Sequence, residues 1–396
     1  MTDTPDRLLI PILSASNFVI GMGAFLVIGL INPMSQDLGI STAQTGWVLT
    51  SYALAYGVLS PVLVSATGRI GRRRILAAGL GIFAIASVLS AISPSEPVLF
   101  ASRIIAAAGA GMFTPVAASV AAGLSAPERR ARALAAVFFG LTLAQVFGVP
   151  AGSFIAYTFG WRLAFVVVAL LALPCLWLIW SRVPAGLSFQ AVTLKDLSKT
   201  LQNGRVMLAV LFTTTFLSAI YVVFTYLSPL LAETMGFGRN GISIALVVSG
   251  FGAVAGNILG GMVADRIGPV RTLISLSILQ TLSLPLFSTL PYPEITVLVL
   301  IFCWSTFGWS FMAAQQVRLI SMAPETASVV LALNAAAIYI GAALGSAIGG
   351  VVLGSHGLHA LGIAGGLMAI VAIAHILLSA RLDQSIDPGQ RPAPPP

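Results

Sequence analysis

Apolar runs of about twenty residues recur along the whole of this chain, and short loops separate them. A run of that length is long enough to cross a bilayer as an α-helix. Only 8% of the 396 residues are charged, whereas 58% are hydrophobic. Because soluble domains have about a quarter of their residues charged, lipid is the solvent that this composition fits. The sequence therefore predicts an all-α membrane protein.

The runs predict twelve transmembrane helices, and one polar stretch divides them into two sets of six. We expect an N-terminal six-helix bundle at 1–181, a cytoplasmic linker at 182–204, a C-terminal six-helix bundle at 205–380 and a cytoplasmic tail at 381–396. The expected spans lie near 9–31, 45–67, 75–93, 97–122, 133–158, 162–181, 205–232, 240–264, 272–291, 295–322, 326–354 and 358–380.

Lysine and arginine gather in alternate loops, and this sets the expected orientation. With both termini in the cytoplasm, seventeen of the twenty Lys and Arg residues fall in inner segments, and Arg162 and Arg239 fall in outer loops. Positive residues favour the cytoplasmic side of a membrane. We therefore expect a multi-pass protein of the cytoplasmic (inner) membrane with both termini inside. The net charge of +8 then reflects topology and not nucleic-acid binding.

A basic turn occurs twice, as ATGRIGRRR at 66–74 and as VADRIGPVR at 263–271. Corresponding positions in the two turns are 197 residues apart, which is almost half of the chain. The same offset aligns Gly152 of span five with Gly349 of span eleven. The two halves are therefore expected to be pseudo-symmetric copies, an architecture found in transporters that rock one half against the other.

Spans five and eleven carry small residues at every fourth position, a spacing that lets helices approach closely. Because the pattern is repeated in both halves, we expect these residues to form an interface that moves; static packing is the alternative. The expected helix-packing residues are Gly148, Pro150, Gly152, Gly341, Gly345 and Gly349.

These features resemble the major facilitator superfamily, specifically its twelve-span drug:proton antiporter branch, and the resemblance covers nearly the whole chain. The signature loop of that family reads Gly-x-x-x-Asp-Arg-x-Gly-Arg-Arg/Lys. Arg103 matches the arginine of the span-four signature, and the GVPAG sequence at 148–152 loosely matches the span-five signature. The matches to the loop are Arg69, Gly71, Arg72 and Arg73 in the first copy and Gly261, Asp265, Arg266 and Gly268 in the second.

The resemblance implies that the two loops form a cytoplasmic conformational latch. In such a latch an aspartate caps a helix end and pairs with arginines when the transporter faces outward. A carboxylate is favourable at both places, because a helix N-terminus and a guanidinium are positive. Gly68 has no carboxylate, so Asp265 is expected to contribute more than the first loop to the balance between inward- and outward-facing conformations. The alternative is that both loops only set the topology of the chain in the membrane. We expect Asp265→Asn to change the ratio of cysteine accessibility between the inner and outer cavities. An unchanged ratio would remove the latch.

Polar and aromatic residues at mid-span are the expected lining of a substrate site. Arg103 lies within a span, where a charge is costly and is a functional candidate by default. Tyr52 and Tyr56 are four residues apart and share one helix face. For each residue taken alone, a hydrogen bond between helices is the alternative role. The expected substrate-binding residues are Asn17, Tyr52, Tyr56, Arg103, Gln145, Tyr221, Tyr226, Trp309, Gln315 and Asn334.

The chain is expected to be a secondary active transporter that exports a small neutral or weakly charged organic molecule by alternating access. The resemblance implies proton antiport, although no Asp or Glu falls in the middle of an expected span and Ala24 stands where related antiporters often have an acid. The alternatives are an efflux permease for a sugar or a purine nucleoside, and a facilitator that is not coupled to protons. A membrane enzyme fits less well because the metal and nucleotide motifs of that class are missing. A channel fits less well because channels usually assemble identical subunits around a pore, whereas this chain carries its own pseudo-symmetry.

The expected partners follow from this class of protein. We expect a monomer that binds a small-molecule substrate and the lipid bilayer, with protons as the coupling ion to test. No cofactor or metal ion is expected, since the three histidines and two cysteines do not form a ligand set. No nucleic acid is expected, because the basic residues lie in short loops between apolar runs.

Overall fold

The computed structural model describes residues 8–68, 70–126, 129–187 and 194–384, and helices make up most of them. Eleven of the described helices or continuous helical segments are long and apolar enough to cross a membrane. A twelfth span is the bent pair formed by α1 (Leu9–Phe25) and α2 (Val27–Leu38). The described chain thus has the expected all-α architecture of twelve spans.

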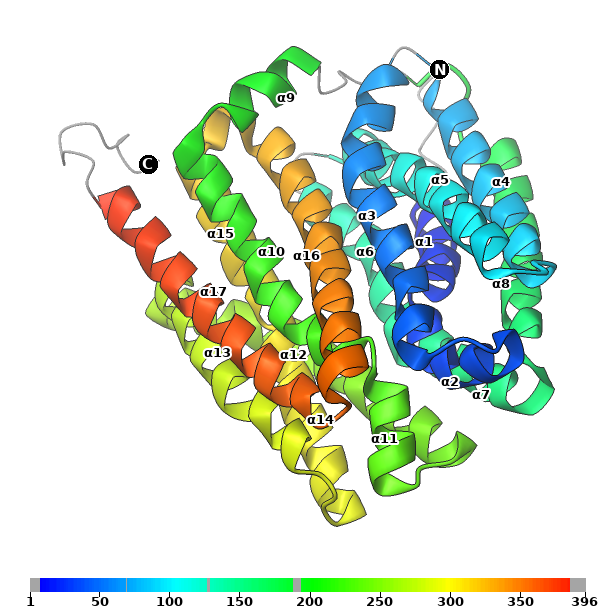
Figure 1. Ribbon diagram of the computed structural model, residues 1–396. Coiled ribbons are helices and arrows are strands. Elements are labelled where there is room, and N and C mark those ends of the chain that lie inside the picture. Colours follow the sequence, from blue (N-terminus) through cyan, green and yellow to red (C-terminus); the bar gives the residue numbers. More distant parts are fainter. Residues whose placement is uncertain (1–7, 69, 127–128, 188–193, 385–396) are drawn as a thin grey trace.

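The spans form two bundles that lie side by side (Figure 1). The N bundle contains α1 with α2, α3 (Thr42–Ala66), α4 (Arg72–Ala91), α5 (Glu96–Gly123), α6 (Arg130–Leu143) with the π-helical segment η2 (Ala144–Gly148) and α7 (Val149–Phe159), and α8 (Trp161–Arg182). The short helix α9 (Leu194–Leu201) follows. The C bundle contains α10 (Gly204–Phe224) with α11 (Leu227–Met235), α12 (Arg239–Ile267), α13 (Pro269–Ser283) with η3 (Leu284–Thr289), α14 (Glu294–Trp309) with α15 (Phe311–Met322), η4 (Pro324–Thr326), α16 (Ala327–His356) and α17 (Ala360–Gln384).

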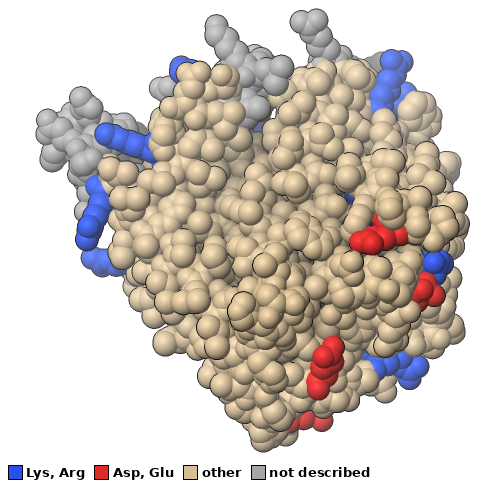
Figure 2. Space-filling model, in the orientation of Figure 1, with Lys and Arg blue, Asp and Glu red and all other residues tan. Residues whose placement is uncertain are grey.

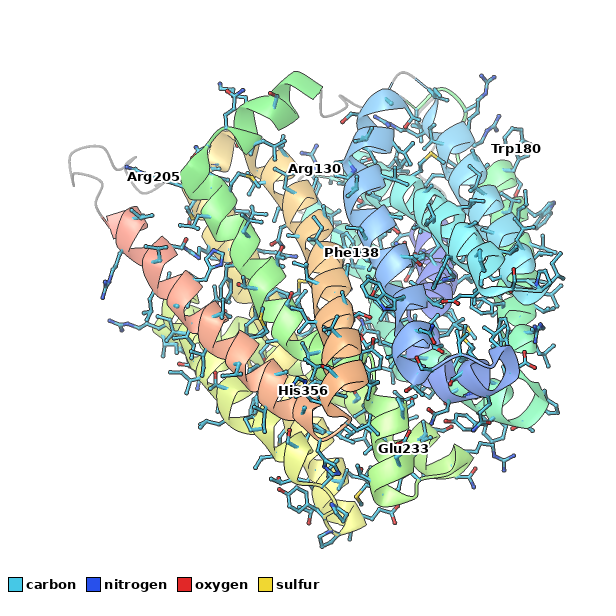
Figure 3. All side chains as sticks on the ribbon, in the orientation of Figure 1. Arg130, Phe138, Trp180, Arg205, Glu233 and His356 are labelled. Carbon is cyan, nitrogen blue, oxygen red and sulfur yellow. The ribbon has the colours of Figure 1, made fainter. Side chains whose placement is uncertain are left out.

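The two ends of the molecule differ in charge. We call the end that carries α9 the linker end, and the opposite end, where α2 meets α11, the far end. Arg130 and Arg205 lie toward the linker end, whereas Glu233 and His356 lie toward the far end (Figure 3). On the face drawn in Figure 2, acidic side chains occupy the middle and lower part of the molecule, away from the linker end.

Equivalent pairs of helices pack in both bundles. The α1–α6 pair corresponds to α10–α16, the α3–α5 pair to α12–α14, and the α4–α8 pair to α13–α17. Each helix of the second set lies six spans after its counterpart. The expected pseudo-symmetry of two six-helix bundles is therefore present in the packing as well as in the sequence.

Local sequence signals explain several of the helix boundaries. Ser41 and Gln44 form a reciprocal capping box at the start of α3, which satisfies two of the free N–H groups there. The side chain of Asn203 accepts a hydrogen bond from the N–H of Val206 and so caps α10. Gly268, with φ of +84°, turns the chain between α12 and α13, a conformation that glycine adopts without strain.

Several spans are broken, which the hydropathy pattern did not predict. Span one bends by 41° at Leu26, and its second part continues to Leu38 rather than ending near residue 31. Span five contains a π-helical segment, and α10 and α11 are separated at Thr225 and Tyr226. Hydropathy reports only whether a segment is apolar, so breaks inside an apolar run leave no trace in it.

The small-residue ladders of spans five and eleven pack inside their own bundles. A Cβ on Gly345 would lie 2.4 Å from the carbonyl oxygen of Ser218 in α10. The expectation that these ladders form the moving interface is therefore wrong, because each one faces the first span of its own half. Pro150 lies in the first turn of α7, directly after the π-helical segment. Gly148 and Gly152 face α1, and Gly341 and Gly349 face α10.

Candidate functional site

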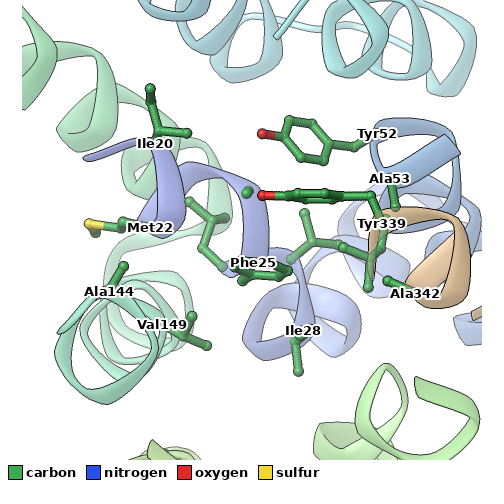
Figure 4. Close-up of a cluster of buried hydrophobic side chains, with 14 of the residues drawn as sticks. Ile20, Met22, Phe25, Ile28, Tyr52, Ala53, Ala144, Val149, Tyr339 and Ala342 are labelled. Carbon is green, nitrogen blue, oxygen red and sulfur yellow. The ribbon is translucent and has the colours of Figure 1, made fainter. Parts of the chain in front are cut away.

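Aromatic side chains from both bundles meet next to the bend of span one. Tyr339 of α16 stacks on Tyr56 of α3 with ring centroids 3.7 Å apart, and on Phe25 of α1 with centroids 6.2 Å apart. Tyr52 of α3 lies 6.4 Å from Tyr56 and from Tyr339. Figure 4 shows the ring of Tyr339 between those of Tyr52 and Phe25. We call Phe25, Tyr52, Tyr56, Tyr339 and the neighbouring Arg103 the central cluster.

Arg103 of α5 is fully buried beside the end of α1. Its Nη2 donates hydrogen bonds to the carbonyl oxygens of Gly23, at 2.8 Å, and Ala24, at 3.2 Å. The guanidinium also lies over the rings of Tyr52, at 4.5 Å, and Phe165, at 5.4 Å. A positive charge is favourable at a helix C-terminus, where carbonyl groups lose their partners. Arg103 therefore stabilises the bend in span one.

Part of this site lacks hydrogen-bond partners. In the described part of the chain, Nε and Nη1 of Arg103 and the hydroxyl of Tyr52 are buried and have no hydrogen-bond partner. Buried polar groups in folded proteins are nearly always hydrogen-bonded, and unpaired ones are costly. Unpaired donors beside an aromatic wall are the arrangement that a ligand with acceptor groups would complete.

Three of the expected lining residues join helices within a bundle. In the N bundle, the hydroxyl of Thr114 donates to Asn17 Oδ1 at 2.9 Å, and Asn17 Nδ2 donates to the carbonyl oxygen of Val137 at 3.2 Å. This cluster connects the first, fourth and fifth spans. The alternative role, a hydrogen bond between helices, therefore describes Asn17 in this conformation.

The C bundle has the matching cluster. The hydroxyl of Thr213 donates to Asn334 Oδ1 at 2.6 Å, and Gln315 Nε2 donates to the Thr213 oxygen at 3.1 Å and to the carbonyl oxygen of Ala209 at 2.7 Å. Asn334 lies 197 residues after Val137, so the offset found in the sequence also relates the two polar clusters. Gln315 and Asn334 connect the seventh, tenth and eleventh spans.

The remaining expected residues occupy three different places. Tyr221 is buried near Phe224, with ring centroids 5.6 Å apart, and its hydroxyl has no partner among the described residues. Trp309 ends α14 at the break before α15. Gln145 lies in the π-helical segment, whose backbone approaches Gly250 of α12. The structure thus brings together Tyr52, Tyr56 and Arg103, and it does not bring Gln145 or Trp309 to them.

The two bundles are joined by hydrogen bonds at the far end. Among the described residues, three hydrogen bonds cross between the bundles, and all three lie on this side. The hydroxyl of Ser228 donates to the carbonyl oxygen of Ile28 at 2.8 Å. The other two are Ser346 Oγ to the carbonyl oxygen of Gly46, at 3.1 Å, and Arg239 Nη1 to Thr158 Oγ1, at 3.2 Å. This conformation is therefore closed at the far end.

Tyr226 fills the space between the bundles at the far end. Its side chain is fully buried, and its hydroxyl donates to the carbonyl oxygen of Ser346 at 2.9 Å. A Cβ on Gly46 of α3 would lie only 2.0 Å from that hydroxyl oxygen. Tyr226 thus belongs to the far-end closure and not to the central cluster.

The two basic turns lie apart, each in its own bundle. Arg72 is buried and its backbone N–H donates to the carbonyl oxygen of Leu187, while the guanidinium of Arg73 lies 4.9 Å from the ring centre of Trp180.

Asp265 and Arg266 are exposed at the end of α12. Among the described residues the one salt bridge joins Arg162 to Asp37, so Asp265 forms an ion pair with none of them in this conformation. Gly71 precedes α4, Gly261 lies near Ala313, and Arg69 is outside the described residues.

Sequence reasoning missed Phe25 and Tyr339 of the central cluster. Tyr339 lies near the middle of the expected span 326–354, so the criterion that selected Tyr52 and Tyr56 would also have selected it. Phe25 has no such signal, because one phenylalanine among many apolar residues is indistinguishable from lipid-facing side chains. Among the described residues, no group of three or more His, Cys, Asp or Glu side chains is arranged to hold a metal ion.

Comparisons with known proteins agree with this architecture. A family model described as Major Facilitator Superfamily matches residues 13–334 and 231–395. An uncharacterized MFS-type transporter of Bacillus subtilis, YtbD, is 33% identical over 91% of this chain and 92% of its own length. A chloramphenicol resistance protein of Streptomyces lividans is 30% identical over 92% of this chain and 93% of its own length.

Two solved structures have the same fold. The crystal structure of a bacterial homolog of the human lysosomal transporter Spinster, in an inward-facing and unoccupied conformation, has a TM-score of 0.75 with 19% identity, over 96% of this chain and 98% of that one. The crystal structure of a D-xylose–proton symporter has a TM-score of 0.74 with 18% identity, over 93% and 96%. With two pseudo-symmetric bundles, a matching family model and relatives along nearly its whole length, the chain belongs to the Major Facilitator Superfamily and is a transporter.

Proposed function

We propose that the protein exports a small aromatic organic molecule, neutral or weakly charged, from the cytoplasm by alternating access. The observation that carries this proposal is the central cluster, in which aromatic rings from both bundles surround buried donors of Arg103 and Tyr52 that lack partners among the described residues. The relative named as a chloramphenicol resistance protein supports efflux of an aromatic compound. The drug-efflux branch is accordingly the one we favour.

The same proposal places the linker end in the cytoplasm of the inner membrane, following the distribution of Lys and Arg. The closed far end then faces outward, and the conformation described above is inward-facing. An exporter in this state receives its substrate from the cytoplasm, and closing the linker end would release the substrate on the other side.

Proton antiport is the coupling that the drug:proton branch favours, and an uncoupled carrier is the second candidate. One observation favours the second: in the described spans no Asp or Glu side chain forms a salt bridge with Arg103. A carboxylate within reach of such an arginine is the usual way to link substrate and proton in one site. Export that survives an uncoupler would exclude proton antiport, and export that a pH gradient drives in vesicles without a membrane potential would support it.

We expect Tyr339→Ala to lower the resistance conferred by the protein about tenfold, because the substrate loses a stacking partner. An aromatic pair contributes up to about 1.4 kcal/mol, which corresponds to about a factor of ten in affinity. Growth of cells with and without the gene is measured against amphenicols, sugars and purine nucleosides, with and without an uncoupler. Efflux of the compound that is protected against is then measured in vesicles.

Trp177→Ala is the matched control for that substitution. Trp177 lies on α8 and is 67% exposed on the outside of the bundle, so its removal takes away an aromatic ring of the membrane surface and leaves the central cluster intact. Export that is unchanged in Tyr339→Ala, or equally reduced in both variants, would contradict the assignment of the site.

A further inference from the structure

The guanidinium of Arg103 is a buried charge whose compensation within the protein is incomplete. Its side chain is fully buried in α5. Nη2 is bound to two backbone carbonyls of α1, while Nε and Nη1 have no hydrogen-bond partner among the described residues. An arginine side chain remains charged in any such environment. Burying a charge is costly unless it is paired and hydrogen-bonded.

None of the described residues forms an ion pair with this group. In the described part of the chain, the salt bridge between Arg162 and Asp37 is the one ion pair, and it lies at the far end of the N bundle. The guanidinium instead contacts carbonyl dipoles and the faces of two aromatic rings, of Tyr52 and Phe165. Such contacts stabilise a cation, but each of them is weaker than an ion pair in the same surroundings.

The neighbouring groups define what would complete the site. Arginine nitrogens only donate hydrogen bonds, and the hydroxyl of Tyr52 also has no partner in the part of the chain that the structure describes. The complement is a group that accepts several hydrogen bonds and is negatively charged. The ring of Tyr52 lies next to the guanidinium, and the rings of Tyr56 and Tyr339 lie 6.4 Å from that of Tyr52, so this neighbourhood favours an aromatic body.

The aromatic surroundings of Tyr52, whose ring lies over Arg103, depend on the relative position of the bundles. Arg103, Tyr52 and Tyr56 belong to the N bundle, whereas Tyr339 belongs to the C bundle and is stacked on Tyr56. When the bundles rock against each other, Tyr339 moves relative to the other rings. The ring of Tyr52 that lies over the guanidinium therefore has Tyr339 as its neighbour in this conformation, and that neighbour changes position in each transport cycle.

We propose that the substrate of this transporter is an aromatic acid in its anionic form, with its acid group bound by Arg103 and its ring against Tyr52, Tyr56 and Tyr339. This inference rests on the proposed export function and names its substrate class. An anion leaves an inside-negative cell along the membrane potential. Its export therefore requires no carboxylate beside Arg103, in agreement with the surroundings of that residue.

The test is a binding measurement on the purified full-length protein in lipid nanodiscs, by titration calorimetry, with benzoate and uncharged benzamide as probes. These two ligands share a ring and differ in charge. Hydrogen bonds to charged groups make a difference of about ten- to a hundredfold in affinity. We expect the protein to bind benzoate more tightly than benzamide by such a factor, and Arg103→Gln to remove that preference.

A second pair of variants keeps the test decisive if Arg103→Gln folds poorly. Ala24 is fully buried, and its carbonyl oxygen lies 3.2 Å from Arg103 Nη2. Ala24→Asp adds an internal carboxylate on the residue whose carbonyl oxygen already binds the guanidinium, and Ala24→Asn adds nearly the same volume without the charge. We expect Ala24→Asp to lose most of the preference for benzoate, and Ala24→Asn to lose much less of it.

Four results would overturn the substrate class: equal binding of the two probes by the wild type, binding of neither, an unchanged preference in Arg103→Gln, or the same preference in both Ala24 variants. The export function is judged separately, by the growth and vesicle measurements above. If neutral aromatic compounds are exported while the preference for the anion is absent, the inference fails and the export function stands. If no compound is exported, the proposed function itself fails.

Discussion

Gly46→Val will hold the far end of the molecule open and remove most of the transport activity. Gly46 lies near the start of α3, and a Cβ at this position would lie 2.0 Å from the hydroxyl oxygen and 2.5 Å from Cζ of Tyr226. The ring of Tyr226 is rigid and fully buried, and its hydroxyl is held by the carbonyl oxygen of Ser346. Positions 349 and 350 of α16 are also glycines in contact with this ring.

The substitution acts on one conformation only. Gly46 belongs to the N bundle and Tyr226 to the C bundle, so the overlap disappears when the far end opens. Overpacking of this kind costs about 1–3 kcal/mol. Since about 1.4 kcal/mol is a factor of ten, the ratio of closed to open far end should fall by about five- to a hundred-and-fifty-fold. Labelling of single cysteines on the two sides of the central cluster, together with efflux from vesicles, measures this change.

Two further variants separate this effect from a general loss of packing. Gly81→Val places the same side chain on α4, where nothing lies within 4 Å of the new Cβ, and it should leave labelling and efflux unchanged. Tyr226→Ala combined with Gly46→Val removes the overlap and should restore closure of the far end relative to Gly46→Val alone. Normal labelling and efflux in Gly46→Val would contradict the far-end closure as described.

Gly345→Val will destabilise the fold without changing the balance between conformations. A Cβ at Gly345 would lie 2.4 Å from the carbonyl oxygen of Ser218 and 2.7 Å from the Cβ of Tyr221, both in α10 of the same bundle. Backbone atoms cannot turn away, so α16 and α10 have to separate. We expect the free energy of unfolding to fall by about 3 kcal/mol, which is the upper end of the usual range for overpacking. The melting temperature should fall clearly as a result.

Gly354→Val is the matched control, because Gly354 lies on the same helix with nothing within 4 Å of its Cβ position. Its melting temperature should remain close to that of the wild type. The fraction of Gly345→Val that folds should show the wild-type ratio of labelling on the two sides, since α10 and α16 stay together in every state. A changed ratio with an unchanged melting temperature would restore the moving interface that the sequence pattern had indicated.

The architecture was predictable because membrane insertion leaves a strong and repeated signal in the sequence. Twenty-residue apolar runs, the loop charges and the 197-residue offset each constrain the fold independently. The offset extends even to the polar clusters, where Asn334 occupies the position equivalent to Val137. The bend at Leu26 was not predictable, because it depends on Arg103, a residue 77 positions away in the sequence whose side chain binds the carbonyls of Gly23 and Ala24.

The candidate site was only partly predictable. Tyr52, Tyr56 and Arg103 were found because polar or aromatic residues are conspicuous inside apolar spans. Depth in a span does not show which way a side chain points, so Asn17 and Gln315 were placed in the lining although they join helices within their own bundles. The ladder of Gly345 was misplaced for the same reason: its spacing shows close packing but not the identity of the partner helix.

Distances between spin labels at the two ends test alternating access most directly. In a background with Cys175→Ser and Cys303→Ser, one pair of labels is placed at the exposed far-end positions Gln36 and Glu233. A second pair is placed at the exposed positions Ala66 and Ser321, which lie at the linker end of the N and C bundles.

Both distances are measured by pulsed electron resonance in nanodiscs, with and without Gly46→Val. We expect opposite changes: the far-end distance lengthens in Gly46→Val and the linker-end distance shortens. If both distances lengthen, or if both stay the same in a variant that has lost transport, the claim that the two bundles rock around the central cluster is contradicted.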